Sequence, residues 1–358
     1  MRLHSVLLLA GALAIGGVPA LAQTAGTWAV TGGMRASEEN AAASLMKDGR
    51  VLVAGGDQGG IGLVVKTAQI YDPATNAWTT VKNMASKRLG HSATTLPDGR
   101  ILIAGGGYGA YPNYKVLKTI ELFDPTTKQF SAGAPMATGR AGHTATMLPG
   151  GKVLVVGGMS AYYLSIRFAV CTNSVELYDP ATANWSTRAP MSKPRCGHTT
   201  TVLPDGRILV AGGDFRSLAN TAEIYDPATN AWTPTGNLNV ARAGHSAALL
   251  NTGRVLVAGP DQSAELYDPA SGSWIATGSE SFTHAGIDIA VLPSGQVLAP
   301  GGNMTGASEL YDPAVGLWSP TGSLNHLRLN FPVTTLANGD VLVSGGYYDW
   351  WTGEIYHH

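Results

Sequence analysis

One recurring segment limits the folds open to this chain. Its clearest copy runs His-Ser-Ala-Thr-Thr-Leu-Pro-Asp-Gly-Arg-Ile-Leu-Ile-Ala-Gly-Gly over residues 91–106. Each copy has small residues, a turn at Gly, branched aliphatics and a Gly pair, and a Tyr-Asp-Pro step and a Trp follow. The first and last Gly pairs lie 290 residues apart, and the six intervals between them give a period of about 48 residues. Strand and turn chemistry at this period predicts a β-propeller.

The landmarks of the repeat cover nearly all of the chain after the first two dozen residues. The Gly pairs stand at 55–56, 105–106, 157–158, 212–213, 301–302 and 345–346, with Gly259-Pro260 as a degenerate seventh. The Tyr-Asp-Pro steps begin at Tyr71, Tyr178, Tyr225, Tyr267 and Tyr311, with Phe123 replacing Tyr once. The aromatics that follow are Trp78, Phe130, Trp185, Trp232, Trp274 and Trp318. This pattern resembles the kelch repeat, which implies an all-β, seven-bladed propeller and leaves the function open, because kelch propellers serve as binding modules, enzymes and scaffolds.

The two ends of the repeat region complete one another. Trp28 looks like the end of a repeat whose beginning is missing, and the segment Glu354-Ile355-Tyr356 belongs to a repeat that stops before its Trp strand. We therefore expect the N-terminal strand around Trp28 to pair with the last strand around Tyr356. Such pairing closes the ring at seven blades and leaves no open sheet edge.

Residues 1–22 are typical of an export signal. Arg2 and His4 form a short polar head, an apolar run spans residues 6–18, and Ala20-Leu21-Ala22 is a cleavage pattern of small residues. We expect residues 23–358 to form one propeller domain, secreted or periplasmic, monomeric, and not inserted in a membrane after cleavage. Without the signal the chain has 22 basic and 24 acidic residues, and this balance disfavours nucleic acid and anionic membranes as partners.

Strand direction predicts which face of the ring carries function. The segment that enters each inner strand and the loop that leaves each Gly pair emerge on the same face, because a hairpin joins the two strands. We call this the variable face, since its loops differ in length and composition from blade to blade. Its aromatic residues Tyr108, Tyr162, Tyr163, Trp350 and Trp351 are candidates for binding a protein or a glycan.

An arginine recurs on the same face and has two interpretations. Arg88, Arg140, Arg195, Arg242 and Arg328 occupy one repeat position, with Ser37 and His284 in the other two blades. Guanidinium groups bind carboxylates in a bidentate manner, so the ring is a candidate site for an acidic peptide or a sugar acid. Alternatively, each Arg pairs with a Glu that recurs before the Tyr step. Blade one has Ser37 in place of the Arg and Gln69 in place of the Glu. Because the Arg and the Glu are lost together, pairing between them inside the blade is favoured.

Four histidines also share one repeat position, which Asn40, Ile287 and Phe331 occupy in the other three blades. They are His91, His143, His198 and His245. Imidazole binds transition metals, but a histidine that fills its own blade and bonds to nearby backbone is the stronger interpretation. We expect no metal and no cofactor.

Two enzymatic alternatives follow from the kelch resemblance. Copper radical oxidases of the galactose oxidase type need two Tyr, two His and a Cys, and Tyr356-His357 resembles their Tyr-His pair only superficially, because the repeat places Tyr356 on the structural tyrosine. Periplasmic kelch mutarotases act on sialic acid through carboxylate and base groups. Glu38 and Glu39 lie side by side where other blades have small residues, and they are weak candidates for the acid and base of such a reaction.

The chain has two cysteines, and both fall on the variable face. Cys171 ends the longest loop of blade three and Cys196 enters blade four. A disulfide suits an exported chain, and two reduced, buried thiols are the alternative. The leading hypothesis from the sequence is an exported kelch-repeat protein that binds a ligand or a partner protein through its variable face, without catalysis.

Overall fold

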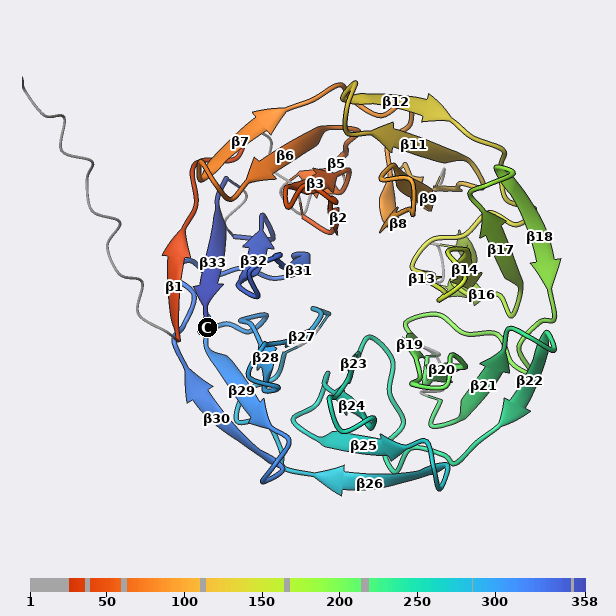
Figure 1. Cartoon of the computed structure of the whole chain (residues 1–358), viewed down its shortest axis with the longest axis vertical. Helices are drawn as coiled ribbons and strands as arrows, with labels where there is room; N and C mark the ends of the chain where they lie inside the picture. Colours follow the sequence, from red (N-terminus) through yellow and green to blue (C-terminus); the bar gives the residue numbers. More distant parts are fainter. Residues whose placement is uncertain are drawn as a thin grey trace, which may run out of the picture.

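Seven antiparallel sheets stand around a central axis in the computed structural model of this chain (Figure 1). The structure describes residues 26–35, 39–58, 63–109, 114–163, 168–213, 219–284, 286–348 and 351–358. Within these ranges the ordered elements are all strands, and no helix there is long and apolar enough to cross a membrane. The predicted seven-bladed propeller is confirmed. The proposed signal, residues 1–22, lies outside the described residues.

Each blade has four main strands, which follow one another from the axis outward. The first three blades are β2 (Ala42–Leu45), β3 (Val51–Ala54), β6 (Ala68–Asp72) and β7 (Ala77–Thr80); β8 (Leu89–Thr95), β9 (Ile101–Tyr108), β11 (Ile120–Asp124) and β12 (Gln129–Ala132); and β13 (Thr144–Met147), β14 (Val153–Val156), β17 (Val175–Asp179) and β18 (Asn184–Arg188). The next two are β19 (Thr199–Val202), β20 (Ile208–Ala211), β21 (Ala222–Asp226) and β22 (Ala231–Pro234); and β23 (Ser246–Leu249), β24 (Val255–Ala258), β25 (Ala264–Asp268) and β26 (Ser273–Thr277). The last two are β27 (Ala290–Val291), β28 (Val297–Ala299), β29 (Ser308–Asp312) and β30 (Leu317–Thr321); and β31 (Val333–Thr335), β32 (Val341–Ser344), β33 (Gly353–His357) and β1 (Thr27–Val30).

The ring closes through its own termini, as the sequence predicted. Strand β1 pairs antiparallel with β33, with Trp28 opposite Tyr356. The indole N–H of Trp28 also donates to the carbonyl oxygen of Gly322 at 2.9 Å, which ties the seam to blade six. Blade seven therefore contains strands from both ends of the chain.

The core lies between blades rather than inside any one of them. One cluster joins Leu102 and Ile120 of blade two to Val153, Val155 and Tyr178 of blade three. Second strands such as β14 are buried along their whole length, because neighbouring blades cover both of their faces. This explains why these strands lack hydrophobic alternation in the sequence.

The Tyr and Trp of each repeat link adjacent blades. Tyr178 lies opposite Trp185, with ring centroids 5.0 Å apart. The indole N–H of Trp185 donates to the carbonyl oxygen of Ala134 in the preceding blade at 2.8 Å. The aromatic landmarks of the repeat are thus structural.

The Gly pairs are required by close approach between blades. A Cβ on Gly105 would lie 2.4 Å from the carbonyl oxygen of Arg140 and 2.9 Å from Cε1 of His143, both in the next blade. A Cβ on Gly106 would meet its own inner strand, 2.9 Å from Cβ of His91. Both glycines also have positive φ, so any other residue would be strained as well as crowded.

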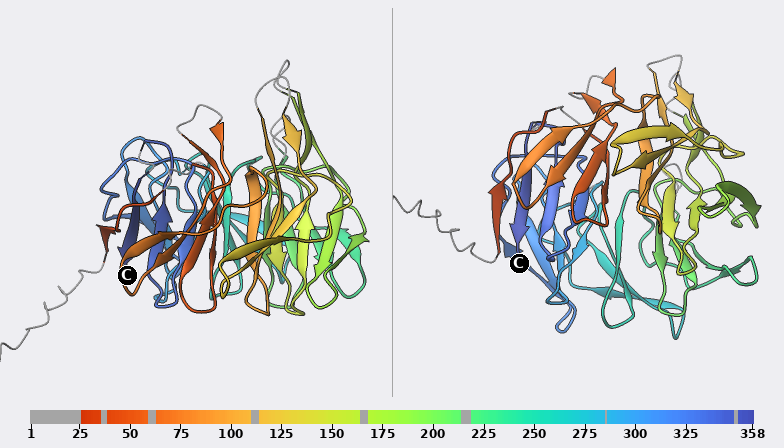
Figure 2. Two further views of the ribbon diagram at one scale, coloured as in Figure 1. Left: turned by 90° about the horizontal axis from the view of Figure 1, so that it is seen from above. Right: turned by 45° about the horizontal axis from the view of Figure 1, so that its top comes forward.

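Extra hairpins decorate blades one to three on the variable face. They are β4 (Asp57–Gln58) with β5 (Leu63–Val64), β10 (Lys115–Val116) against the end of β9, and β15 (Met159–Tyr163) with β16 (Phe168–Cys171). In the side view these elements rise on one side of the ring (Figure 2). They make one sector of the variable face taller than the rest.

Candidate binding site on the propeller axis

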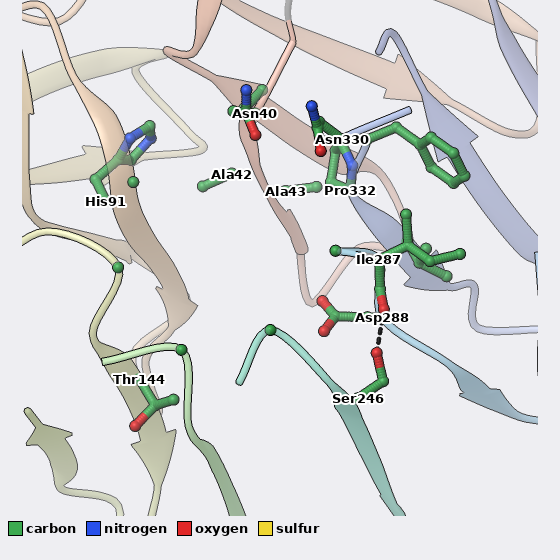
Figure 3. Close-up of a pocket in the computed structure, with 18 of the residues that line it drawn as sticks. Asn40, Ala42, Ala43, His91, Thr144, Ser246, Ile287, Asp288, Asn330 and Pro332 are labelled. Carbon is green, nitrogen blue, oxygen red and sulfur yellow. Dashed lines mark hydrogen bonds between the residues drawn. The ribbon is translucent and has the colours of Figure 1, made fainter. Parts of the chain in front are cut away.

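A cavity of about 470 Å³ occupies the axis where the inner strands begin, at the variable face. All seven blades contribute to its wall. The lining residues include Asn40, Ala42, Ala43, His91, Thr144, Ser246, Ile287, Asp288, Asn330 and Pro332 (Figure 3). Among the described residues, the lining contains neither Lys nor Arg.

A ring of residues in the left-handed conformation forms the mouth of this cavity. It comprises Gly90, Gly142, Gly197, Gly244, Gly286, Asn330 and Asn40, all at positive φ. Backbone hydrogen bonds join neighbouring members of the ring, for example from Gly142 N to Gly90 O at 2.7 Å and from Asn40 N to Asn330 O at 2.7 Å. Gly and Asn are the residues that tolerate this conformation best. The ring brings backbone groups and two amide side chains to the cavity surface.

Four histidines lie behind the ring, and each bonds to the preceding blade. The Nε2 atom of His91 donates to the carbonyl oxygen of Ala54 at 3.0 Å. That of His143 forms a hydrogen bond with the hydroxyl of Ser92 at 3.0 Å, and His198 and His245 do the same with Thr144 and Thr199 at 3.1 Å. Burial, followed by the charge of the nearby arginine, lowers the pKa of all four histidines to about 3. They are neutral and blade-forming, as the stronger interpretation of the sequence held.

Asp288 is the one carboxylate among the described residues that line the cavity. Its side chain is exposed to the cavity and points toward the axis (Figure 3). The inner strands that stand around the cavity nevertheless desolvate this carboxyl group, and this raises the pKa of Asp288. No positive side chain stands against it among the described residues of the lining.

Asp288 is not among the residues predicted from the sequence, although its repeat position carries a signal. The residue after the repeat histidine is Ser92, Thr144, Thr199 or Ser246 in four blades. In blade six the same position holds Asp288 next to Ile287, which replaces the histidine. The fold does not require a charged residue at this position, because four other blades carry a hydroxyl there.

The five repeat arginines do not line a ligand-binding surface, which corrects the expectation that they bind an anion. Arg140 is 0% exposed and forms a salt bridge of 2.7 Å with Glu176. Its guanidinium also donates to the carbonyl oxygens of Gly157 and Ser174 at 2.7 and 3.1 Å. The same buried pairing occurs for Arg88, Arg195, Arg242 and Arg328 with Glu121, Glu223, Glu265 and Glu354. Each arginine thus pairs with the glutamate of its own blade, as the alternative interpretation of the sequence proposed.

Blade one departs from the expected register by one residue. Ala42 pairs with Ala54, and Ser92 pairs with Ala104 in the next blade. The position of Arg88 therefore falls on Glu38 rather than Ser37, and the position of His91 falls on Ala41 rather than Asn40. Gln69 still occupies the Glu position, opposite Val53.

The two weak catalytic candidates have different outcomes. Glu38 lies outside the described residues. Glu39 is buried, and its Oε1 accepts a hydrogen bond from Asn330 Nδ2 at 2.9 Å. Its backbone bridges to Asp57. Glu39 does not line the cavity, but the Asn330 amide that it binds does. Glu39 therefore suits a role in positioning Asn330 better than one in proton transfer.

The predicted aromatic residues are spread around the variable face. Tyr108 ends β9, and the ammonium group of Lys115 lies 6.0 Å from its ring centroid. Trp351 is 55% exposed in blade seven, and Tyr347 and Tyr348, which precede it in the sequence, form a T-shaped pair. Tyr162 and Tyr163 are in β15, but their side chains lie outside the described residues, and so does Trp350. The structure does not gather the described members of this set into one cluster at the axis.

Cys171 and Cys196 form a disulfide, with Cα atoms 5.5 Å apart. The bond links the base of the β15–β16 hairpin to the entry of blade four. A backbone bridge between Thr172 and Arg195 lies directly beside it.

Departures from the repeat concentrate at the junction of blades five and six. Glu280 replaces the Met or Leu that packs there in other blades, and neither of its carboxyl oxygens has a hydrogen-bond partner among the described residues. Burial, together with the charge of Glu309, raises the pKa of Glu280 to about 9. His284 replaces the arginine and forms a hydrogen bond with Glu309 at 3.2 Å.

Replacing Glu280 with Met is expected to raise the free energy of unfolding by about 2–3 kcal/mol at pH 7.5, because the buried carboxyl group has no partner. The stability that this group contributes is present below its unfolded pKa of 4.5 and is lost as the pH rises toward 9. The gain in urea unfolding experiments should therefore shrink toward pH 5. An equal gain at both pH values would show that packing, rather than charge, causes the effect.

Comparisons with known proteins agree on the fold. The chain is similar to a novel fungal alcohol oxidase of the AA5 family in complex with copper, with a TM-score of 0.74, 17% identity, and coverage of 93% of this chain and 76% of that one. It is also similar to the protein YjhT, with a TM-score of 0.62, 14% identity, and coverage of 81% of this chain and 99% of that one. At these identities the likeness shows the fold alone.

The residues of this chain do not match a copper site of the galactose oxidase type. Among the residues that the structure describes, no group of three or more His, Cys, Asp or Glu is arranged to hold a metal. The hydroxyl of Tyr356 bonds to Thr321 at 2.7 Å, and His357 bonds to Asp340 at 3.0 Å. Both cysteines are in the disulfide.

Sequence comparison supplies the family. None of the curated proteins matches this sequence. The model of the KLHDC2/KLHL20/DRC7 Kelch-repeats domain matches residues 40–259, which is more than half of the chain. This chain therefore belongs to the family of Kelch-repeat domains.

Proposed function

We propose that this protein is an exported binding protein that holds a neutral, polyhydroxylated ligand, such as a sugar, in the axial cavity. The observation that carries this proposal is the chemistry of the lining. It offers the amides of Asn40 and Asn330, the carboxylate of Asp288, hydroxyls and backbone groups. A carboxylate or an amide suits a sugar because its polar atoms can bond to neighbouring hydroxyls.

The charge of the cavity argues for a neutral ligand and against a sugar acid. The four histidines are uncharged at neutral pH, and the five arginines are buried and paired. A ligand carboxylate would meet Asp288 with no cation in the described lining to offset it. The expectation of a sugar-acid ligand in this site is therefore replaced by a neutral one.

The sequence and the disulfide support export. Residues 1–22 have the features of a signal, and the bond between Cys171 and Cys196 suits an oxidising compartment. Mass spectrometry of the secreted or periplasmic protein tests this part. An N-terminus at Gln23 is the expected result, and a chain beginning at Met1 would contradict it.

Asp288→Asn is expected to weaken ligand binding by about 10- to 100-fold, because a hydrogen bond to a charged group contributes about 1.5–3 kcal/mol. The measurement is calorimetric titration of the wild type and the variant with a panel of neutral sugars and sugar acids. The melting temperature should stay within a few degrees, since Asp288 is exposed to the cavity. Asp124→Asn, in a turn on the opposite face, is the matched control. Unchanged binding in Asp288→Asn, or binding of a sugar acid that depends on Asp288 and is tighter than that of any neutral sugar, would overturn the proposal.

A sugar-converting activity of the mutarotase type is a second candidate, and Asp288 is the observation that favours it. A cavity carboxylate with a raised pKa can take and return the proton that opens and closes a sugar ring. Under this alternative, the wild type accelerates the exchange of sugar anomers, and Asp288→Asn does not. Binding of a sugar without faster exchange of its anomers would contradict this activity and keep the binding function.

A further inference from the structure

We infer that the outer rim of the variable face, over blades one to three, is a second binding surface that takes an anionic, carboxylate-bearing polysaccharide. This surface, the lysine rim, consists of Lys66, Lys82, Lys87, Lys115, Lys118 and Lys193. It is separate from the axial cavity, whose lining contains none of these residues.

Lysine is distributed very unevenly in this chain. The sequence has nine lysines, all within the first 193 residues. Six of them form the lysine rim, and Lys47, Lys128 and Lys152 lie in the turns of the opposite face. The whole chain has a net charge of −1, so the rim is a local feature and not a consequence of a basic protein.

The backbone holds the rim lysines together at each junction between blades. Between blades one and two, Met84 N donates to Lys66 O at 2.9 Å and Arg88 N donates to Val65 O at 3.1 Å. These bonds bring Lys66 beside the segment that carries Lys82 and Lys87.

The next junction repeats this arrangement. Met136 N donates to Lys118 O at 2.9 Å, and Arg140 N donates to Leu117 O at 3.0 Å. Lys115 follows on the β10 extension. The charges therefore continue along the rim from one blade to the next.

The rim lysines are exposed, and no salt bridge to any of them occurs among the described residues. On the opposite face, in contrast, several cations have acidic partners. Arg50 pairs with Asp48 at 2.6 Å, and Lys152 pairs with Asp179 at 2.9 Å. The positive charge of the rim is thus left for a partner from outside the chain.

The chemistry of the rim favours a polysaccharide over other anions. An open groove of about 710 Å³ at the first junction is lined by Lys66, Lys82 and the ring of Phe130. Tyr108 lies beside Lys115 at the next blade. Alternating charges and rings suit a chain of sugar acids, since rings stack on sugar faces and ammonium groups meet carboxylates. Lysine lacks the planar fork with which arginine binds phosphate.

The test uses the full mature protein with polygalacturonate as the probe. The wild type is expected to bind, with an affinity that falls as the salt concentration rises. The variant Lys66→Gln/Lys82→Gln/Lys87→Gln should bind at least about tenfold more weakly, and its salt slope should be shallower by about 2. The melting temperature reports whether each variant is folded.

A matched variant separates the lysine rim from net charge. Lys47→Gln/Lys128→Gln/Lys152→Gln removes the same number of charges from the opposite face and should bind like the wild type. Equal losses in the two triple variants would overturn the inference. Tighter binding of DNA or of anionic lipid vesicles than of polygalacturonate, or no binding of polygalacturonate at low salt, would overturn it as well.

Discussion

Replacing Arg140 with Ala is expected to lower the free energy of unfolding by about 3–5 kcal/mol, because it leaves the buried carboxylate of Glu176 without its cation. Arg140 and Glu176 are both almost fully buried and 2.7 Å apart. The guanidinium also bonds to Gly157 and Ser174, and these oxygens would lose a donor. Urea unfolding of the wild type and the variant measures the loss.

The double variant Arg140→Met/Glu176→Gln is the control for charge. Blade one shows that a blade folds with Gln69 in the Glu position, and replacing both partners leaves no buried charge. The double variant should recover more than half of the lost stability. A loss below about 1 kcal/mol in Arg140→Ala would show that the pair is dispensable, contrary to its burial.

Mild acid is expected to destabilise the propeller strongly through its four neutral histidines. Burial lowers the pKa of His91, His143, His198 and His245 to about 3 in the folded protein, from an ordinary value of 6.5. Their contribution to stability is complete above pH 6.5 and is lost as the pH falls toward 3. Each histidine contributes about 1.4 kcal/mol per pH unit in this range, so the four together lose about 5 kcal/mol between pH 7.5 and 5.5.

Glu280 partly masks this effect, because its own contribution increases as the pH falls. The measurement is therefore cleanest in the Glu280→Met variant, by urea unfolding at pH 7.5 and 5.5. His143→Gln in that background should reduce the pH dependence by about a quarter, because one of the four buried histidines is then absent. A stability that is the same at both pH values would contradict neutral, buried histidines.

The architecture could be predicted from the sequence because each blade of a propeller corresponds to one repeat of the sequence. The Gly pair, the Tyr-Asp-Pro step and the Trp each satisfy a contact that recurs in most blades, such as Gly105 against His143 or Trp185 against Ala134. The closure of the ring could be predicted in the same way, because Trp28 and Tyr356 belong to the two parts of one repeat. The pairing of Arg with Glu was visible through their joint absence in blade one.

The site was harder to predict, because its residues are those that depart from the repeat. Glu280 and Asp288 stand where other blades have a Met or Leu and a hydroxyl, and no local pattern says whether such a residue faces a core, a cavity or solvent. The one-residue error in blade one had the same origin, since the pairing of Ala42 with Ala54 decides the register there. Repeat position alone also could not show that the arginine ring is buried.

The sequence by itself therefore determined the seven blades, their closure and the face that varies, because each depends on contacts repeated at a fixed spacing. Tertiary structure decided which charges are available to a ligand. It buries the five arginines inside their own blades, where carboxylates neutralise them, and leaves Asp288 in the axial cavity and the lysine rim in solvent. Exposure depends on all seven blades packing at once, and a single repeat of the sequence does not contain that information.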